Sequence, residues 1–199
     1  KEFRRALEAN PDNYQPYLYL GQINLNRKNY DQAVAEVDRI LEQNERFAPA
    51  YLLKGMYLYS AGNSPAAEAS YKKVLEINAD DPVASNNLAW IYASEDRNLD
   101  NALTLAENAR GKDPNNPNYA DTLGWVYYKM GRYILAADQL LFAINNGEPG
   151  PDNYYRLGMA YYRNGDQTLA VQSLRKAVAA GKDFEGIEEA RQVLKELGN

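Results

Sequence analysis

A single spacing recurs along this chain. Five short stretches, YLGQIN, LKGMYL, NLAWIY, TLGWVY and RLGMAY, align on one small residue each. The aligned residues are Gly21, Gly55, Ala89, Gly124 and Gly158, and successive positions differ by 34, 34, 35 and 34 residues. A second series, Ala33, Ala67, Ala102, Ala136 and Ala170, differs by 34, 35, 34 and 34 residues. A fixed period of this length is typical of solenoids built from stacked supersecondary units.

Each period is long enough for two antiparallel helices joined by a turn. Turns are predicted at NRKNY, SAGNSP, KMGRY and RNGD, where Asn and Gly tolerate left-handed backbone. The aligned small residues are expected to let a neighbouring helix approach closely, although Gly inside a helix costs about 1 kcal/mol relative to Ala. We therefore predict an all-α fold of twelve helices, the last marked by Ile187, Ala190, Leu194 and Leu197.

The period and the residue types resemble the tetratricopeptide repeat, whose signature is W-x2-L-G-x2-Y, then A-x3-F, then P. The fourth period matches at Leu123, Gly124, Tyr127, Ala136 and Leu140. The fifth period matches at Tyr154, Leu157, Gly158, Tyr161, Ala170 and Leu174. Lys54 and Asn24 depart from the signature without disturbing the spacing. The resemblance implies a right-handed α-solenoid of helix-turn-helix repeats, with the tyrosines of the signature in the core.

The resemblance also divides the chain into a single array over residues 1–199. The repeats are predicted at 14–47, 48–81, 82–116, 117–150 and 151–184. Residues 1–13 are expected to end a truncated repeat, which places the natural start upstream and makes self-association through this N-terminal end a further expectation. Residues 185–199 are expected to form a capping helix, because the end of a solenoid otherwise exposes its apolar face.

One side of the first helix in each repeat carries many apolar and aromatic side chains. By the resemblance, this side lines the concave face of a tetratricopeptide superhelix. Trp, Tyr and Met are enriched at protein interfaces, although the same stripe is also consistent with packing between neighbouring helices. Asn87 offers an amide for a peptide backbone, and Lys129, Arg156 and Arg163 offer charge to a carboxylate. The predicted partner-binding groove consists of Leu52, Met56, Tyr59, Asn86, Asn87, Trp90, Asp121, Trp125, Tyr128, Lys129, Tyr155, Arg156, Met159, Tyr162 and Arg163.

Composition argues against several other functions. The chain has no Cys and no His, and its Ser residues lie in no nucleophile-elbow pattern, so we predict no enzyme and no catalytic residues. Phosphate loops, dinucleotide fingerprints and metal-ligand clusters are missing, so no cofactor or metal is expected. The net charge of -5 argues against nucleic acid. No apolar run approaches the roughly 18 residues of a membrane span, so this segment is not expected to insert.

The stretches NNLAWIYA, ADTLGWVYYKMGRY and LGMAYYRNGD are similar to the C-terminal arrays of bacterial tetratricopeptide proteins of exopolysaccharide and exosortase systems. This similarity implies a periplasmic or envelope-associated protein. We predict a non-catalytic scaffold that binds a peptide or partner segment in a bacterial envelope or secretion-related complex. The alternative is a polysaccharide-associated module in which Trp90, Trp125 and groove tyrosines contact sugar. The groove has few amides and carboxylates, which favours protein.

Overall fold

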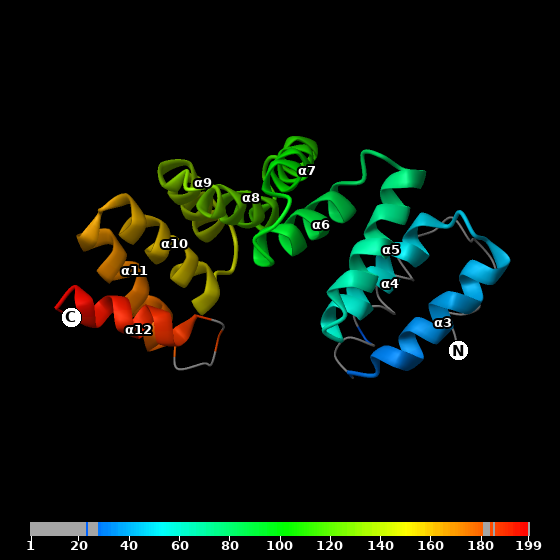
Figure 1. Cartoon of the computed structure of the whole chain (residues 1–199), viewed down its shortest axis with the longest axis horizontal. Coiled ribbons are helices and arrows are strands. Elements are labelled where there is room, and N and C mark those ends of the chain that lie inside the picture. Colours follow the sequence, from blue (N-terminus) through cyan, green and yellow to red (C-terminus); the bar gives the residue numbers. More distant parts are fainter. Residues whose placement is uncertain (1–22, 24–27, 181–183, 185, 199) are drawn as a thin grey trace. The chain divides into compact units, whose positions relative to one another are not determined.

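The computed structural model describes residues 23, 28–180, 184 and 186–198, and in these residues the regular elements are all α-helices (Figure 1). They are α3 (Tyr30–Gln43), α4 (Ala48–Ser60), α5 (Ser64–Ile77), α6 (Pro82–Ser94), α7 (Leu99–Lys112), α8 (Pro117–Lys129), α9 (Tyr133–Asn146), α10 (Pro151–Asn164), α11 (Gln167–Ala179) and α12 (Ile187–Glu196). The predicted all-α fold is confirmed. The truncated repeat predicted at residues 1–13 and the first helix of the repeat at 14–47 lie outside the described residues, apart from residue 23, which is helical.

The chain divides into two compact units, Lys1–Leu88 and Ala89–Asn199, with the division inside α6. In the first unit, α4 packs on α3 and α5. In the second unit, α8 packs on α7, α9 and α10, and α10 packs on α9, α11 and α12. Each hairpin therefore contacts the next along the sequence within its unit. The predicted limits of the individual repeats stay a prediction.

Turn chemistry at the helix ends follows the sequence pattern. The Asn63 side chain accepts a hydrogen bond from the Ala66 N–H at 3.2 Å and so caps α5. Gly62, Gly131 and Gly165 adopt left-handed backbone with φ of 81°, 74° and 91° at the turns after α4, α8 and α10. At the turn before α3, the left-handed residue is Lys28, with φ of 56°. The predicted turns are thus present, one of them without Gly or Asn at the left-handed position.

The aligned glycines allow close contact between the two helices of a hairpin, as predicted. A Cβ atom on Gly124 would lie 2.7 Å from Cγ of Leu140, and one on Gly158 would lie 2.6 Å from Cγ of Leu174. In the first unit, a Cβ atom on Gly55 would lie 2.5 Å from a ring carbon of Tyr71. Each glycine therefore accommodates a large side chain of the partner helix, and close packing outweighs the low helix propensity of Gly.

The signature tyrosines are less buried than the sequence predicts. Tyr92, at the place in the third period that corresponds to Tyr127, is fully enclosed, whereas Tyr127, Tyr154 and Tyr161 are half-buried. The Tyr127 hydroxyl reaches the surface and donates to Oε1 of Glu107 at 3.3 Å. The prediction that these rings lie in the core is correct for Tyr92, whereas the other three are only partly buried. A half-buried tyrosine packs its ring against the protein and keeps its hydroxyl in water.

The last helix packs as the sequence predicts. Ala190, Val193 and Leu194 of α12 are buried against α10 and α11, while Ile187 and Leu197 are half-buried. The opposite side of α12 is charged and exposed, with Glu188 and Arg191 among its residues. Within the parts of the chain described above, none of the helices combines the length and the apolar character that a membrane-spanning helix requires.

Candidate partner-binding face

Two aromatic side chains of α8 form the centre of the candidate face. Trp125 and Tyr128 are three residues apart and therefore project from the same side of the helix. Their rings stack with centroids 4.7 Å apart and an interplanar angle of 4°. Tyr128 also contacts Tyr133, the first residue of α9, at a centroid distance of 5.7 Å. Trp125 and Tyr128 are both half-buried, so part of the stacked pair is open to solvent.

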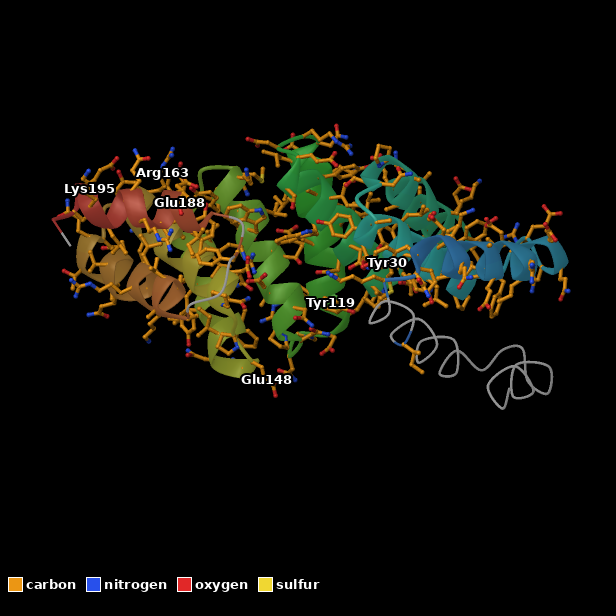
Figure 2. All side chains as sticks on the ribbon, turned by 90° about the horizontal axis from the view of Figure 1, so that it is seen from below. Tyr30, Tyr119, Glu148, Arg163, Glu188 and Lys195 are labelled. Carbon is orange, nitrogen blue, oxygen red and sulfur yellow. The ribbon has the colours of Figure 1, made fainter. Side chains whose placement is uncertain are left out.

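A cation lies at each end of these rings. Lys129 Nζ lies 5.3 Å from the ring centroid of Trp125. Arg163, from the end of α10, lies 5.4 Å from the Tyr133 centroid, and its Nη2 donates to the Tyr133 hydroxyl at 3.0 Å. Arg163 is exposed and lies at the surface of the second unit (Figure 2). We call Lys129, Trp125, Tyr128, Tyr133 and Arg163 the cation–aromatic row.

A buried ion pair joins α8 to α10 beside this row. Arg156 Nη2 lies 2.8 Å from Oδ2 of Asp121, and Arg156 Nε donates to Oδ1 at 3.3 Å. Asn153 Nδ2 donates to the same Asp121 Oδ1 at 2.9 Å, and the Arg156 guanidinium lies 5.1 Å from the Trp90 ring centroid. Asp121 and Arg156 therefore neutralise each other between two helices. This arrangement differs from the charged groove surface that the sequence suggests.

The inner side of α10 is covered by α12. Tyr155 and Met159 are 9% and 2% exposed and belong to the core between α10 and α12. The Tyr155 hydroxyl donates to Glu189, and the Tyr162 hydroxyl donates to Oε2 of Glu196 at 2.9 Å. The prediction of an open groove needs correction for Tyr155 and Met159, because the capping helix packs across the side of α10 that carries them.

In the first unit the predicted residues take different places. Leu52 is buried, Met56 packs partly against the core of α3 and α4, and Tyr59 is exposed. The Asn87 side chain is already used inside the unit. It accepts a hydrogen bond from Nδ2 of Asn86 at 3.3 Å and also bonds to the hydroxyl of buried Tyr71.

The Asn87 amide is therefore not a free peptide-binding group in this structure. Burial raises the pKa of the Tyr71 hydroxyl well above its usual range, and the hydrogen bond to Asn87 offsets part of that rise. Within the described residues, Oδ1 of Asn86 is enclosed and has no hydrogen-bond partner. The side-chain oxygen that still lacks a hydrogen-bond partner at this place therefore belongs to Asn86 and not to Asn87.

The structure thus brings together only part of the predicted set. Trp125, Tyr128, Lys129 and Arg163 form one connected row, and burial together with the Glu189 carboxylate raises the pKa of Tyr128. Tyr133 is the member that sequence reasoning missed. It follows the KMGR turn, and a tyrosine there reads as the start of the second helix rather than as part of a face formed by first helices.

Three family models match the chain. The model described as "Psidin, N-terminal TPR repeats region" matches residues 23–144. Two models described as "Tetratricopeptide repeat" match residues 122–183 and 2–35. Together the matched regions span nearly the whole sequence, including the stretches that carry the 34-residue spacing.

Individual proteins are more distant. The chain is 21% identical to DnaJ homolog subfamily C member 3 of Rattus norvegicus over 100% of its own length and 43% of that relative, so it spans about two fifths of it. A thermophilic TPR protein of Thermus thermophilus superposes with a TM-score of 0.70 at 21% identity, covering 92% of this chain and all of that one. YrrB, described as a TPR protein with an unusual peptide-binding site, superposes with a TM-score of 0.67 at 19% identity. The match covers 96% of this chain and 98% of YrrB.

Proposed function

The chain belongs to the tetratricopeptide repeat family, and from this premise we propose that it is a scaffold that binds a segment of a partner protein on the face formed by α8 and α10. Proteins of this family are generally non-catalytic interaction scaffolds. The peptide-binding site named for YrrB agrees with this function in a protein of similar fold. The proposed function is binding alone, without a chemical reaction on the partner.

The observation that carries the proposal is the stacked pair of Trp125 and Tyr128. Large aromatic side chains that are fully desolvated on binding dominate interface energetics. The two rings are half-buried and stacked in parallel, and Tyr128 also packs against the edge of the core that α10 and α12 form. Because the rings are already held in place by their stacking, these side chains would lose little conformational entropy when a partner binds.

The proposal is tested by titrating a partner recovered by cross-linking in cells that express the full chain. We expect Trp125→Ala to weaken the affinity roughly thirtyfold, since anchors of this kind are worth about 2 kcal/mol or more. Trp90→Ala, at the neighbouring place on α6, is expected to act in the same direction. Tyr127→Ala is the matched control, because Tyr127 lies on the same helix and contacts Glu107 instead of the row.

The outcome that would count against a binding face is equally definite. If Trp125→Ala lowers the melting temperature strongly while the folded fraction binds the partner with unchanged affinity, Trp125 is a packing residue. In that case the face of α8 and α10 is not the binding site.

The proposed setting is a bacterial envelope or secretion-related complex, which follows from the similarity of NNLAWIYA, ADTLGWVYYKMGRY and LGMAYYRNGD to arrays of exopolysaccharide and exosortase systems. Fractionation of the native host tests it: the protein is expected with the envelope, and recovery from the cytosol alone contradicts it. The competing function is contact with polysaccharide, for which the stacked rings would serve as a sugar platform. Binding to a purified polysaccharide without any protein partner would favour that function.

A further inference from the structure

We propose that the cation–aromatic row recognises an acidic segment of the partner protein, with carboxylates at the Lys129 and Arg163 ends and an apolar or aromatic side chain between them. This inference rests on the proposed function and specifies the chemistry of the partner. Two observations support it: the contacts that Lys129 and Arg163 make within the fold, and the stacked aromatic rings that lie between them.

Arg163 meets neutral groups at both of its described contacts. Its guanidinium lies against the Tyr133 ring and donates to the Tyr133 hydroxyl. An aromatic face attracts a cation but carries no net charge. The side chain is exposed, so a carboxylate can approach it from solvent without first being desolvated by the protein. A planar guanidinium can bind such a carboxylate with two hydrogen bonds.

Lys129 is in a similar position at the other end of the row. Its ammonium lies over the Trp125 ring, and its ion-pair partner, Oδ2 of Asp96, is 4.0 Å away. That separation is long for a direct hydrogen bond, and the Asp96 side chain is 65% exposed, so water screens the pair. The Lys129 side chain is 22% exposed and remains reachable from solvent.

Three other cations among the described residues have a carboxylate much closer. Arg156, next to the row, forms a buried pair with Asp121 at 2.8 Å. On α5, Lys72 and Lys73 have carboxylates at 2.7 and 2.5 Å. Compared with these three, the two ends of the row carry positive charge that the fold neutralises less completely. Charge complementarity predicts an anionic group at each end.

The centre of the row sets a different requirement. Besides burial, the nearby Glu189 carboxylate raises the pKa of Tyr128, and a further carboxylate there would meet electrostatic repulsion. The stacked rings of Trp125 and Tyr128 instead offer apolar surface. A segment that fits all three places has acidic residues on both sides of an apolar or aromatic one.

Selection from a random peptide display library on the full chain tests this inference. We expect the enriched peptides to contain Asp or Glu on both sides of an aromatic residue. The variant Lys129→Gln with Arg163→Gln is expected to lose this acidic enrichment. The control is Lys72→Gln with Lys73→Gln, which changes the net charge equally at two exposed side chains of α5 and is expected to select the same peptides as the unmodified chain.

Titration of the most enriched peptide gives the magnitude. We expect at least tenfold weaker binding to the doubly substituted row, little change in the α5 control, and affinity that falls with added salt. Melting temperatures are compared in parallel. If the double variant is unstable, Arg163→Gln alone retains the test, because Arg163 is exposed.

The outcomes separate this inference from the function on which it rests. Peptides that bind the row without acidic enrichment overturn the inference and leave the protein-binding scaffold intact. Failure to enrich any peptide contradicts both. Binding of oligogalacturonate that depends on Lys129 and Arg163, with no acidic peptide selected, overturns the inference in favour of an anionic polysaccharide.

Discussion

At Gly158, a side chain of even one carbon would lie 2.6 Å from Cγ of Leu174 and 3.1 Å from the backbone nitrogen of the same residue. Gly111, near the end of α7, has no atom within 4 Å of the corresponding position. Both glycines lie in helices, and neither has a positive φ. Only one of them is therefore required by packing, and the two form a natural pair for comparison.

We expect Gly158→Ala to lower the free energy of unfolding by about 1–2 kcal/mol, because overpacking outweighs the gain in helix propensity. Gly111→Ala is expected to raise it by up to about 1 kcal/mol. Urea denaturation followed by circular dichroism measures both. Equal stabilisation by the two substitutions would show that Leu174 moves aside without cost.

Individual residues of the candidate face were only partly predictable from the sequence. The spacing placed Trp125 and Tyr128 on one side of a helix, because three residues make almost one turn. It did not reveal that Asp121 is neutralised by Arg156, since a pairing between helices depends on which rotamers the packing allows. Tyr133 was missed because it belongs to a second helix and reaches the row across the turn.

At the scale of elements, the packing of α12 determines how much of the α10 surface is accessible to solvent. Its apolar residues were predictable from their spacing, and Val193, which the predicted pattern omits, is buried with them. The sequence also predicted a capping role. What it did not show is that the cap covers Tyr155 and Met159, because the face chosen by a terminal helix depends on its packing partners rather than on its own periodicity.

Neighbouring residues of α12 provide a test of this packing. Val193 is 4% exposed, whereas Gln192 is exposed. We expect Val193→Asp to release α12 from α10, because burying an unpaired charge costs several kcal/mol. Gln192→Asp is expected to leave it packed. Hydrogen exchange of the α12 amides measures the release, and equal protection in the two variants would contradict it.

Deletion of residues 185–199 extends the same test. It is expected to uncover Tyr155 and Met159 and to promote aggregation, since both are enclosed when α12 is present. A truncated chain that stays monomeric with an unchanged melting temperature would show that α12 is not needed as a cap.

At the scale of the whole molecule, most of the raised pKa values among the described residues belong to tyrosines. The chain has 17 Tyr and no His. Burial is the main cause of the raised pKa values of Tyr71, Tyr127, Tyr128 and Tyr161. A raised pKa in the folded state means that the unfolded chain ionises first as pH increases. The stabilising effect is therefore complete below the unfolded value of about 10 and is lost as pH rises through the folded values.

We expect the free energy of unfolding to be nearly constant between about pH 6 and 9, where no histidine titrates. Above about pH 10 it should fall, by up to about 1.4 kcal/mol per pH unit for buried Tyr71 and by less for the more exposed Tyr127 and Tyr161. Urea denaturation at a series of pH values checks this, with Tyr71→Phe as the comparison. An unchanged slope in that variant would mean that Tyr71 does not contribute.

The glycine contacts also determine which hairpins can be exchanged as cassettes. In α8–α9 and in α10–α11 the glycine faces a leucine, with nearly the same separations. In α4–α5 the glycine faces the ring of Tyr71 instead. A hairpin made from α8 and α11 would therefore keep the contact between a glycine and a leucine. A hairpin made from α8 and α5 would instead place a tyrosine ring where α8 is shaped to contact leucine. The repeats share one period, but their helices are not freely interchangeable parts.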